Sequence, residues 1–359
     1  MSSVNYASAA APASASGLPL VDLRSDTVTR PTPAMRQAML SAELGDDVFG
    51  DDPTVNALQT RIAELLGFEA ALYMPSGTAS NLCALLTHCG RGDEYLVGQL
   101  AHTYRYEGGG AAVLGGIQPQ PLAQQPDGSL ALADIAAAIK PDDVHFARSR
   151  LLCLENTWNG KVLSLDYLAE ATALARQRGL NTHLDGARLF NAAVATAGAD
   201  GDPYAAARQI ASHFDSVSVC FSKGLGAPVG SALCGSRAFI EQAKRARKMT
   251  GGGMRQVGLL AAGALHALEH HVHRLADDHA LARRLAEGLA ALPGITVTQP
   301  HTNIVFAEVA DGRGGALLEH LRTRGVLATG LIGLRFVTHL DVDAAGVDRA
   351  LAAAAEFLL

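Results

Sequence analysis

Short apolar runs of strand length alternate with longer stretches of helical periodicity between residues 70 and 234, and this alternation restricts the fold most strongly. The helical stretches include Ala79–His88 and Leu165–Arg178. The expected strands are Ala70–Met74, Glu94–Val97, Leu151–Leu154, Asn181–Asp185, Val217–Phe221 and Ser231–Cys234. Strands separated by helix-length connections favour an α/β fold with a mostly parallel sheet between helices.

The pattern changes near Gly258, where one long helix is expected from Val257 to about Leu292. Short strands and helices are expected beyond it, at Ile295–Thr298, Asn303–Ala307, Leu317–Arg324, Arg335–Val337 and the C-terminus. Before the first strand, helices are expected over Pro33–Leu44 and from the Asp52-Pro53 cap to Leu66. We therefore predict a disordered Ala/Ser-rich tail over residues 1–17, a large domain over 18–264 and a smaller α+β domain over 265–359.

Composition excludes several classes of protein. The net charge is −6 with no long basic run, so nucleic acid is not an expected partner. No stretch of eighteen apolar residues occurs, which argues against a membrane-spanning helix. The five cysteines form no CxxC pair, which favours free thiols in a reducing cytoplasm. Charged residues make up only 18% of the chain, which suggests that some surface is buried between subunits.

Two strand ends carry residues suited to covalent cofactor chemistry. Lys223 follows an alternating strand and precedes two glycines. Burial there would favour the neutral amine, which can bond covalently to a carbonyl carbon, although a lysine that merely leaves the sheet is the simpler reading. Asp185 ends another strand, where its carboxylate could pair with a protonated pyridine nitrogen or cap the next helix. Arg188 could hold a substrate carboxylate.

Two further segments complete the pattern. Ser76-Gly77-Thr78 turns a strand into a helix, and free N–H groups at a helix N-terminus suit a phosphate. His102 follows the strand that ends at Val97, so it could stack on a ring and exchange protons, or serve only the structure. Together the four segments predict a site for pyridoxal 5'-phosphate.

Four longer motifs then identify a resemblance. The segments 21–31 (VDLRSDTVTRP), 45–55 (GDDVFGDDPTV), 185–188 (DGAR) and 249–256 (MTGGGMRQ) resemble the low-specificity L-threonine aldolases, which are fold-type-I pyridoxal-phosphate enzymes. The resemblance runs from about residue 20 to the end. It implies an aldehyde-lyase that cleaves β-hydroxy-α-amino acids such as L-threonine and L-allo-threonine to glycine and an aldehyde.

The resemblance also implies roles for individual residues. Lys223 matches the lysine that holds the cofactor, Asp185 its pyridine partner and His102 the stacking ring. Gly77 and Thr78 match phosphate-binding residues. Ser25, Arg188 and Arg335 match the residues that receive the substrate carboxylate, and Arg255 matches an arginine that reaches the phosphate of a neighbouring subunit. The family is typically a homotetramer with sites at dimer interfaces.

One position departs from the family. Relatives often carry histidine in a Glu-Asn-Thr-His-Asn segment, and that histidine is associated with the substrate β-hydroxyl. This chain has Trp158 there, which offers an N–H donor and a large apolar face but no base. We therefore take His102 as the candidate base and expect bulky β-substituents, such as that of phenylserine, to be accepted.

Other readings remain. Within the same cofactor class the alternative is a β-eliminating lyase or an aminotransferase. A nicotinamide oxidoreductase is disfavoured because no GxGxxG occurs, and an inactive scaffold because Lys223, Asp185 and His102 are all present. No metal site is expected. The histidines at 266–273 lack an HExxH motif, and the acidic loop at 46–52 lacks the ligand spacing of a calcium loop.

Overall fold

The computed structural model describes residues 20–358, which form two compact units. The larger unit is Pro31–Val272, and the smaller one contains the described residues up to Arg30 and those from His273 onward. The predicted tail over residues 1–17 lies outside the described residues. No helix among the described residues is long and apolar enough to cross a membrane.

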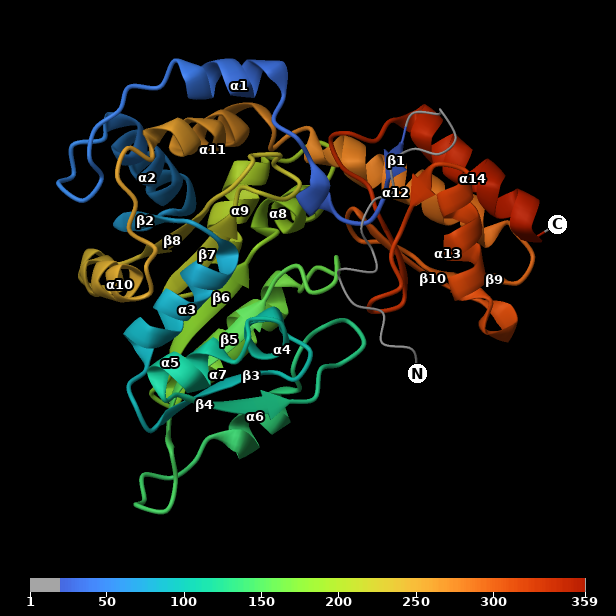
Figure 1. The fold of residues 1–359 in the computed structure, drawn as a ribbon. Helices are drawn as coiled ribbons and strands as arrows, with labels where there is room; N and C mark the ends of the chain where they lie inside the picture. The colour runs from blue at the N-terminus through green and yellow to red at the C-terminus, as the bar shows by residue number, and fades with distance from the viewer. Residues whose placement is uncertain (1–19, 359) are drawn as a thin grey trace. The chain divides into compact units, whose positions relative to one another are not determined.

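The larger unit is built on a seven-stranded sheet with the strand order β2-β8-β7-β6-β5-β3-β4 (Figure 1). Its strands are β2 (Ala70–Met74), β3 (Asp93–Gly98), β4 (Gln118–Leu122), β5 (Arg148–Glu155), β6 (Asn181–Gly186), β7 (Ser216–Cys220) and β8 (Ser231–Gly235). The pairings from β4 through β7 are parallel, whereas β8 runs antiparallel to both β2 and β7. The mostly parallel sheet predicted from the alternating pattern is confirmed.

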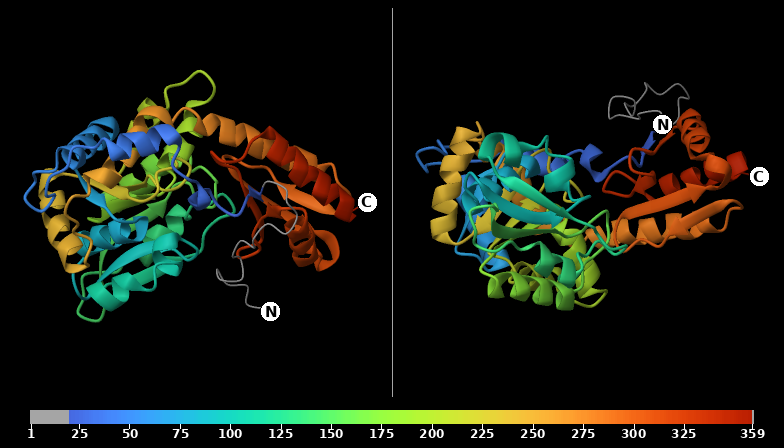
Figure 2. Two further views of the ribbon diagram at one scale, coloured as in Figure 1. Left: turned by 45° about the horizontal axis from the view of Figure 1, so that its top comes forward. Right: turned by 90° about the horizontal axis from the view of Figure 1, so that it is seen from below.

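Helices lie on both sides of this sheet (Figure 2). They are α1 (Pro33–Leu40), α2 (Pro53–Leu66), α3 (Gly77–His88), α4 (His102–Arg105), α5 (Gly110–Gly115), α6 (Leu132–Ala138), α7 (Leu165–Gln177), α8 (Leu189–Ala197), α9 (Pro203–Ala211), α10 (Arg237–Met249) and α11 (Gly258–His270). Helices α3 and α10 pack on each other and on β2 and β8, while α2 packs on α9 and α11. Leu72, Met74 and Leu233 bury their side chains in the layer against α3 and α10.

Side-chain caps fix where several of these helices begin. Asp52 caps α2 by accepting the N–H groups of Thr54 and Val55, and its second oxygen accepts the N–H of Gly258 at 2.9 Å. The same carboxylate therefore joins the N-termini of α2 and α11. Ser76 caps α3 in the same manner by accepting the N–H of Ala79 at 3.1 Å.

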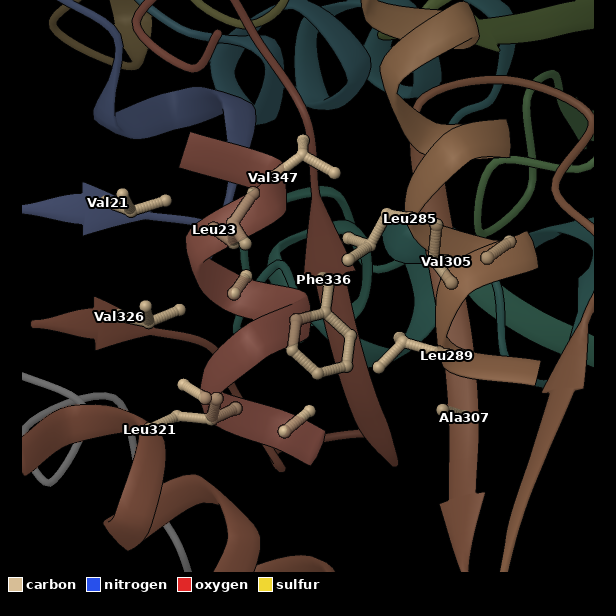
Figure 3. Close-up of a cluster of buried hydrophobic side chains, with 14 of the residues drawn as sticks. Val21, Leu23, Leu285, Leu289, Val305, Ala307, Leu321, Val326, Phe336 and Val347 are labelled. Atoms are coloured by element: carbon tan, nitrogen blue, oxygen red, sulfur yellow. The ribbon is translucent and has the colours of Figure 1, made fainter. Parts of the chain in front are cut away.

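The smaller unit has its own core (Figure 3). Its elements are β1 (Val21–Asp22), η2 (Asp26–Val28), α12 (Leu275–Ala290), β9 (Ile295–Thr298), β10 (Ile304–Val309), η3 (Ala310–Gly312), α13 (Gly314–Thr323), β11 (Val326–Leu327), β12 (Leu334–Val337) and α14 (Ala344–Leu358). An antiparallel sheet of order β12-β10-β9 carries Phe336 and Val305, which pack with Leu285 and Leu289 of α12. The predicted α+β character of this region is confirmed.

The helix expected from Val257 to about Leu292 is wrong as a single element, because α11 ends at His270 and α12 begins at Leu275. His271 leaves the helix to donate from Nδ1 to the carbonyl of Leu225 at 2.7 Å, and Val272 is buried beside it. No glycine or proline marks this break in the sequence. The helical pattern of apolar residues therefore gave no signal that the helix ends there.

The boundary between the units also differs from the predicted domains. The division falls between Val272 and His273 rather than at 264, and the described residues up to Arg30 belong to the smaller unit. Strand β1 explains the second difference, because Val21 and Asp22 pair in parallel with Val326 and Leu327 of β11. The first helix is also shorter than expected and ends at Leu40.

Candidate active site

Lys223 lies three residues beyond β7, in a turn closed by the N–H of Gly226, which donates to the Lys223 carbonyl at 2.8 Å. Its side chain is half-buried. Gly230, which ends the loop, has a φ of +108°, and a Cβ there would lie 2.3 Å from the Tyr73 hydroxyl. A side chain at that position would therefore clash with the Tyr73 ring and would also strain the backbone.

Asp185 lies near the end of β6, is 2% exposed and stands opposite Glu155 of β5 in the parallel register. Its Oδ1 accepts the N–H of Ala187 at 3.1 Å, and its Oδ2 accepts the Asn81 side-chain amide at 2.9 Å. The carboxylate is thus held in place from two sides, at the end of the sheet where ligands bind in α/β folds.

His102 begins α4 and is tied to a buried carboxylate. Its Nδ1 is 2.8 Å from Oε1 of Glu107, whose side chain is 5% exposed. The hydrogen bond that His102 donates to Glu107 raises the pKa of His102, and burial raises the pKa of Glu107. Both shifts favour a proton held between the two groups. Asn81 also donates to Glu107, at 2.9 Å, so one amide bridges Glu107 and Asp185.

Glu155 ends β5 and accepts the backbone N–H of His102 at 2.9 Å. Burial, and then the charge of Asp185, raise its pKa to about 7, while the charges of His102 and Lys223 act in the opposite direction. Glu155 and Asp185 are partners in the parallel register of β5 and β6, and the charges of His102 and Lys223 also act on Glu155.

The N-terminus of α3 also lies close to the end of β7. The N–H groups of Gly77 and Thr78 have no acceptor within residues 20–358, whereas Ser76 serves Ala79. A Cβ at Gly77 would lie 2.6 Å from the Cys220 sulfur. The charges that act on the buried Cys220 thiol include those of Lys223, Asp185 and Arg188.

Trp158 lies in the loop after β5, where its backbone pairs with Lys161. One edge of the indole packs so closely on Gly128 that a Cβ there would lie 2.7 Å from it. The indole Nε1–H is buried and finds no hydrogen-bond partner among the described residues. A buried donor without a partner is unusual, so it is a candidate to meet a ligand.

The remaining predicted residues have other surroundings. Arg255 is exposed and pairs with Asp46 of the acidic loop at 3.1 Å. In the smaller unit, Ser25 caps the turn at Thr27, and Arg335 donates to the carbonyl of Arg24 at 3.2 Å. The smaller unit therefore brings Ser25 and Arg335 near each other through Arg24.

Sequence reasoning missed Asn81, Glu107 and Glu155 as site residues. Each lies within or next to a segment that contains a predicted site residue. Their contacts are with residues elsewhere in the chain, which no local sequence motif indicates. Ligand-capable atoms of His102, Glu107 and Asp185 lie within 4.8 Å of one another. The Asn81 amide donates to both carboxylates, which accounts for their proximity as a hydrogen-bonded network.

The donor set fits pyridoxal 5'-phosphate. The amine of Lys223, the buried acceptor of Asp185, the ring of His102 and the two N–H groups at the start of α3 match its aldehyde, pyridine nitrogen, ring face and phosphate. Fold and site thus define a cofactor-dependent enzyme of the α/β class.

Comparison with known proteins places the chain in a family. Residues 22–312 match the family described as beta-eliminating lyase, and the chain belongs to it. Within this family it belongs to the low-specificity L-threonine aldolases. The low specificity L-threonine aldolase of Escherichia coli (strain K12) is 54% identical over 324 residues, which cover 90% of this chain and 95% of the relative.

A second relative supports the family, and a solved structure supports the fold. The low-specificity L-threonine aldolase 1 of Arabidopsis thaliana is 45% identical over 318 residues, covering 86% of this chain and 87% of the relative. The structure of Leishmania major threonine aldolase superimposes with a TM-score of 0.79 at 22% identity, covering 94% of this chain and 100% of that one. The predicted fold, family and cofactor, pyridoxal 5'-phosphate, are confirmed.

Proposed function

We propose that this chain cleaves L-threonine, L-allo-threonine and other β-hydroxy-α-amino acids to glycine and an aldehyde. The observation that carries the proposal is the 54% identity over 90% of the chain to a low specificity L-threonine aldolase. The grouping of Lys223, Asp185 and His102 at neighbouring strand ends supports it.

We propose that Lys223 holds the cofactor through its amine and that Asp185 pairs with the protonated pyridine nitrogen. The N–H groups of Gly77 and Thr78 bind the phosphate, and His102 lies against the ring. When bound, the cofactor supplies a conjugated system that takes up the electron pair released as the Cα–Cβ bond breaks.

The substrate carboxylate is assigned to three residues. Arg188 lies at the N-terminus of α8 and acts electrostatically on Cys220 near the end of β7. The role of Ser25 and Arg335 in binding the substrate carboxylate is supported by the sequence resemblance alone. A carboxylate fixed in this manner orients the bond to be broken.

The His102–Glu107 pair is proposed to accept the proton of the substrate β-hydroxyl. Because Nδ1 of His102 faces Glu107, Nε2 is the ring atom that can take this proton. Glu107 then balances the positive charge that the ring gains. Trp158 cannot share this role because an indole carries no basic nitrogen.

Assembly and location are part of the proposal. We infer a homotetramer in which Arg255 reaches the phosphate of a neighbouring subunit, as the sequence pattern suggests. The five cysteines are free and buried, which supports a reducing cytoplasm.

Product analysis tests the function. Purified enzyme loaded with pyridoxal phosphate is incubated with L-threonine and with L-allo-threonine, and glycine, acetaldehyde, 2-oxobutanoate and ammonia are measured. We expect glycine and acetaldehyde in equal amounts. Formation of 2-oxobutanoate and ammonia instead would establish the β-eliminating alternative that the family's description leaves open.

We also propose that Trp158 favours substrates with bulky β-substituents. The apolar indole, with a buried and unpaired Nε1–H among the described residues, offers contact area to an aromatic ring and a donor to the β-hydroxyl. Comparison of kcat/KM for phenylserine and threonine tests this, and a strong preference for threonine contradicts it.

A further inference from the structure

A chain of hydrogen bonds leads through the interior of the larger unit to the carboxylate of Asp185. It starts at His88 on α3, whose Nε2 is 2.7 Å from the hydroxyl of Ser216 on β7. The same hydroxyl is 2.8 Å from Nδ1 of His183 on β6. Nε2 of His183 is in turn 3.2 Å from Oδ1 of Asn81. Three elements of the core are thus linked by polar side chains alone.

The last link fixes the direction of the whole chain. Asn81 donates from Nδ2 to Oδ2 of Asp185 and to Oε1 of Glu107, each at 2.9 Å. The amide nitrogen faces these two carboxyl oxygens, which accept from it, and the amide oxygen faces His183. Oδ1 of Asn81 therefore accepts, and Nε2 of His183 carries the proton.

The protonation of His183 sets the links behind it. Its side chain is fully buried, and burial lowers its pKa to about 3, so the ring is neutral near pH 7. With the proton on Nε2, Nδ1 is bare and accepts the hydroxyl proton of Ser216. The Ser216 oxygen then accepts from Nε2 of His88. Every donor points toward the two carboxylates.

We propose that His183 and Asn81 are positioning residues that hold the Asp185 carboxylate in place and fix Glu107 behind His102. The inference rests on the proposed roles of Asp185 and His102 and extends them by two residues. Hydrogen bonds donated to a carboxylate stabilise its charged form. An ionised Asp185 can keep a pyridine nitrogen protonated, whereas a protonated one cannot.

The arrangement does more than satisfy buried polar groups. Ser80, next to Asn81 on α3, is equally buried, and its hydroxyl pairs with that of Ser218 at 2.7 Å. That pair satisfies itself and donates nothing to the site carboxylates. It therefore provides a matched control for the effect of disturbing α3 and β7.

The first test reads the proton directly. Full-length enzyme carrying pyridoxal phosphate is labelled with ¹⁵N-histidine, and the tautomer of His183 is assigned by NMR with His183→Gln as the reference for its signals. We expect a neutral ring with the proton on Nε2. A proton on Nδ1, or a doubly protonated ring at pH 7, overturns the proposal.

The second test uses variants. We expect Asn81→Ala and His183→Phe to weaken pyridoxal-phosphate binding, to shift the absorbance maximum of the lysine-bound cofactor and to lower kcat more than they raise KM. Mutation of residues that hydrogen-bond to metal-binding histidines typically lowers metal affinity or activity about 10–100-fold, and we expect losses of cofactor affinity and kcat of that order. His183→Gln, which can keep a donor toward Asn81, should recover part of the loss, and Ser80→Ala should resemble the wild type.

The variant Asp185→Asn distinguishes the proposed role of Asp185 from the positioning role of Asn81 and His183. If Asp185→Asn abolishes the absorbance of the lysine-bound cofactor while Asn81→Ala and His183→Phe leave it unchanged, the positioning role of Asn81 and His183 is refuted and the proposed function stands. If Asp185→Asn itself has no effect, the proposed role of Asp185 fails. A further outcome is that Asn81→Ala and His183→Phe lose thermal stability while their spectra and cofactor affinity stay unchanged. That result would show that Asn81 and His183 have a purely structural role, and it would also refute the proposed positioning role.

Discussion

At the scale of single residues, Trp158 occupies the position where the resemblance to the family leads us to expect a histidine. The indole packs against Gly128, and its Nε1–H is buried without a partner among the described residues. A histidine at this position would be smaller, polar and basic, so the exchange would change both the size and the chemistry of the proposed substrate contact.

We expect Trp158→His to shift preference from phenylserine toward threonine. The lost apolar contact should lower kcat/KM for phenylserine by about tenfold relative to threonine, the order expected for changes in an apolar pocket. Steady-state kinetics with both substrates provide the measurement, and Trp158→Phe, which keeps the apolar face, is the control. An unchanged ratio in Trp158→His would remove Trp158 from the substrate pocket.

Candidate site residues could be named from the sequence where they stand at a strand end next to a recognisable turn, as Lys223, Asp185 and Gly77 do, and their roles stay predictions. Asn81 and His183 could not be named in this way, although both lie inside segments that attracted attention. Their importance comes from side chains that meet across α3 and β6, 102 positions apart in the sequence. A single sequence does not display such pairs.

At the scale of elements, the approach of α3 to β7 shapes the proposed phosphate site. A Cβ at Gly77 would meet the Cys220 sulfur at 2.6 Å, and its next neighbour would be 3.8 Å away at Ser231. A single side chain therefore makes glycine necessary at this position, and the conflict can be relieved by shortening that side chain.

We expect Gly77→Ala to lower Tm and to weaken pyridoxal-phosphate binding, because overpacking of this kind costs about 1–3 kcal/mol. The double variant Gly77→Ala/Cys220→Ala should recover most of both losses, with Cys220→Ala as the matched control. Thermal melting and cofactor titration give the readouts. A double variant no better than Gly77→Ala would rule out the Cys220 contact as the cause.

Helix α12 contains a buried histidine, His279, from which we expect a loss of stability in acid. His279 is 4% exposed, and burial, with the charge of Arg283, lowers its pKa to about 4. Because the unfolded chain binds this proton near pH 6.5 and the folded chain does not, the stabilising contribution is complete above pH 6.5 and is lost as pH falls toward 4.

We therefore expect the wild type to lose more stability than His279→Gln between pH 7.5 and pH 5, by about 2 kcal/mol. The measurement is Tm of both proteins in the same buffers, with His145→Gln as control because its side chain is 80% exposed. Equal losses of Tm in the wild type and in His279→Gln would show that His279 does not carry this sensitivity.

Elements were predicted well where local signals mark their ends, as with the Asp52 cap and the strand Ala70–Met74. The break between α11 and α12 was missed because no local sequence signal marks it. His271 bonds to the Leu225 carbonyl, and nothing near it in the sequence interrupts the helical period.

At the scale of the whole molecule, the chain forms two units, and the smaller one combines segments from the two ends of the described chain. Segment 20–30 pairs with residues more than three hundred positions later through β1 and β11. This non-local pairing places Ser25 and Arg335, both proposed to bind the carboxylate, in the same unit. The α/β class and the family could be predicted from patterns and motifs, but the assignment of residues 20–30 required the structure.

Lys223 is the residue on which the proposed function depends most, because it is proposed to hold the cofactor. Borohydride reduction of the loaded enzyme fixes the cofactor to the amine that carries it, and proteolysis with mass spectrometry locates that amine. We predict the modification on Lys223, and no modified peptide from Lys223→Ala treated in the same way. A cofactor fixed to another lysine, or full aldol cleavage by Lys223→Ala, would contradict the account.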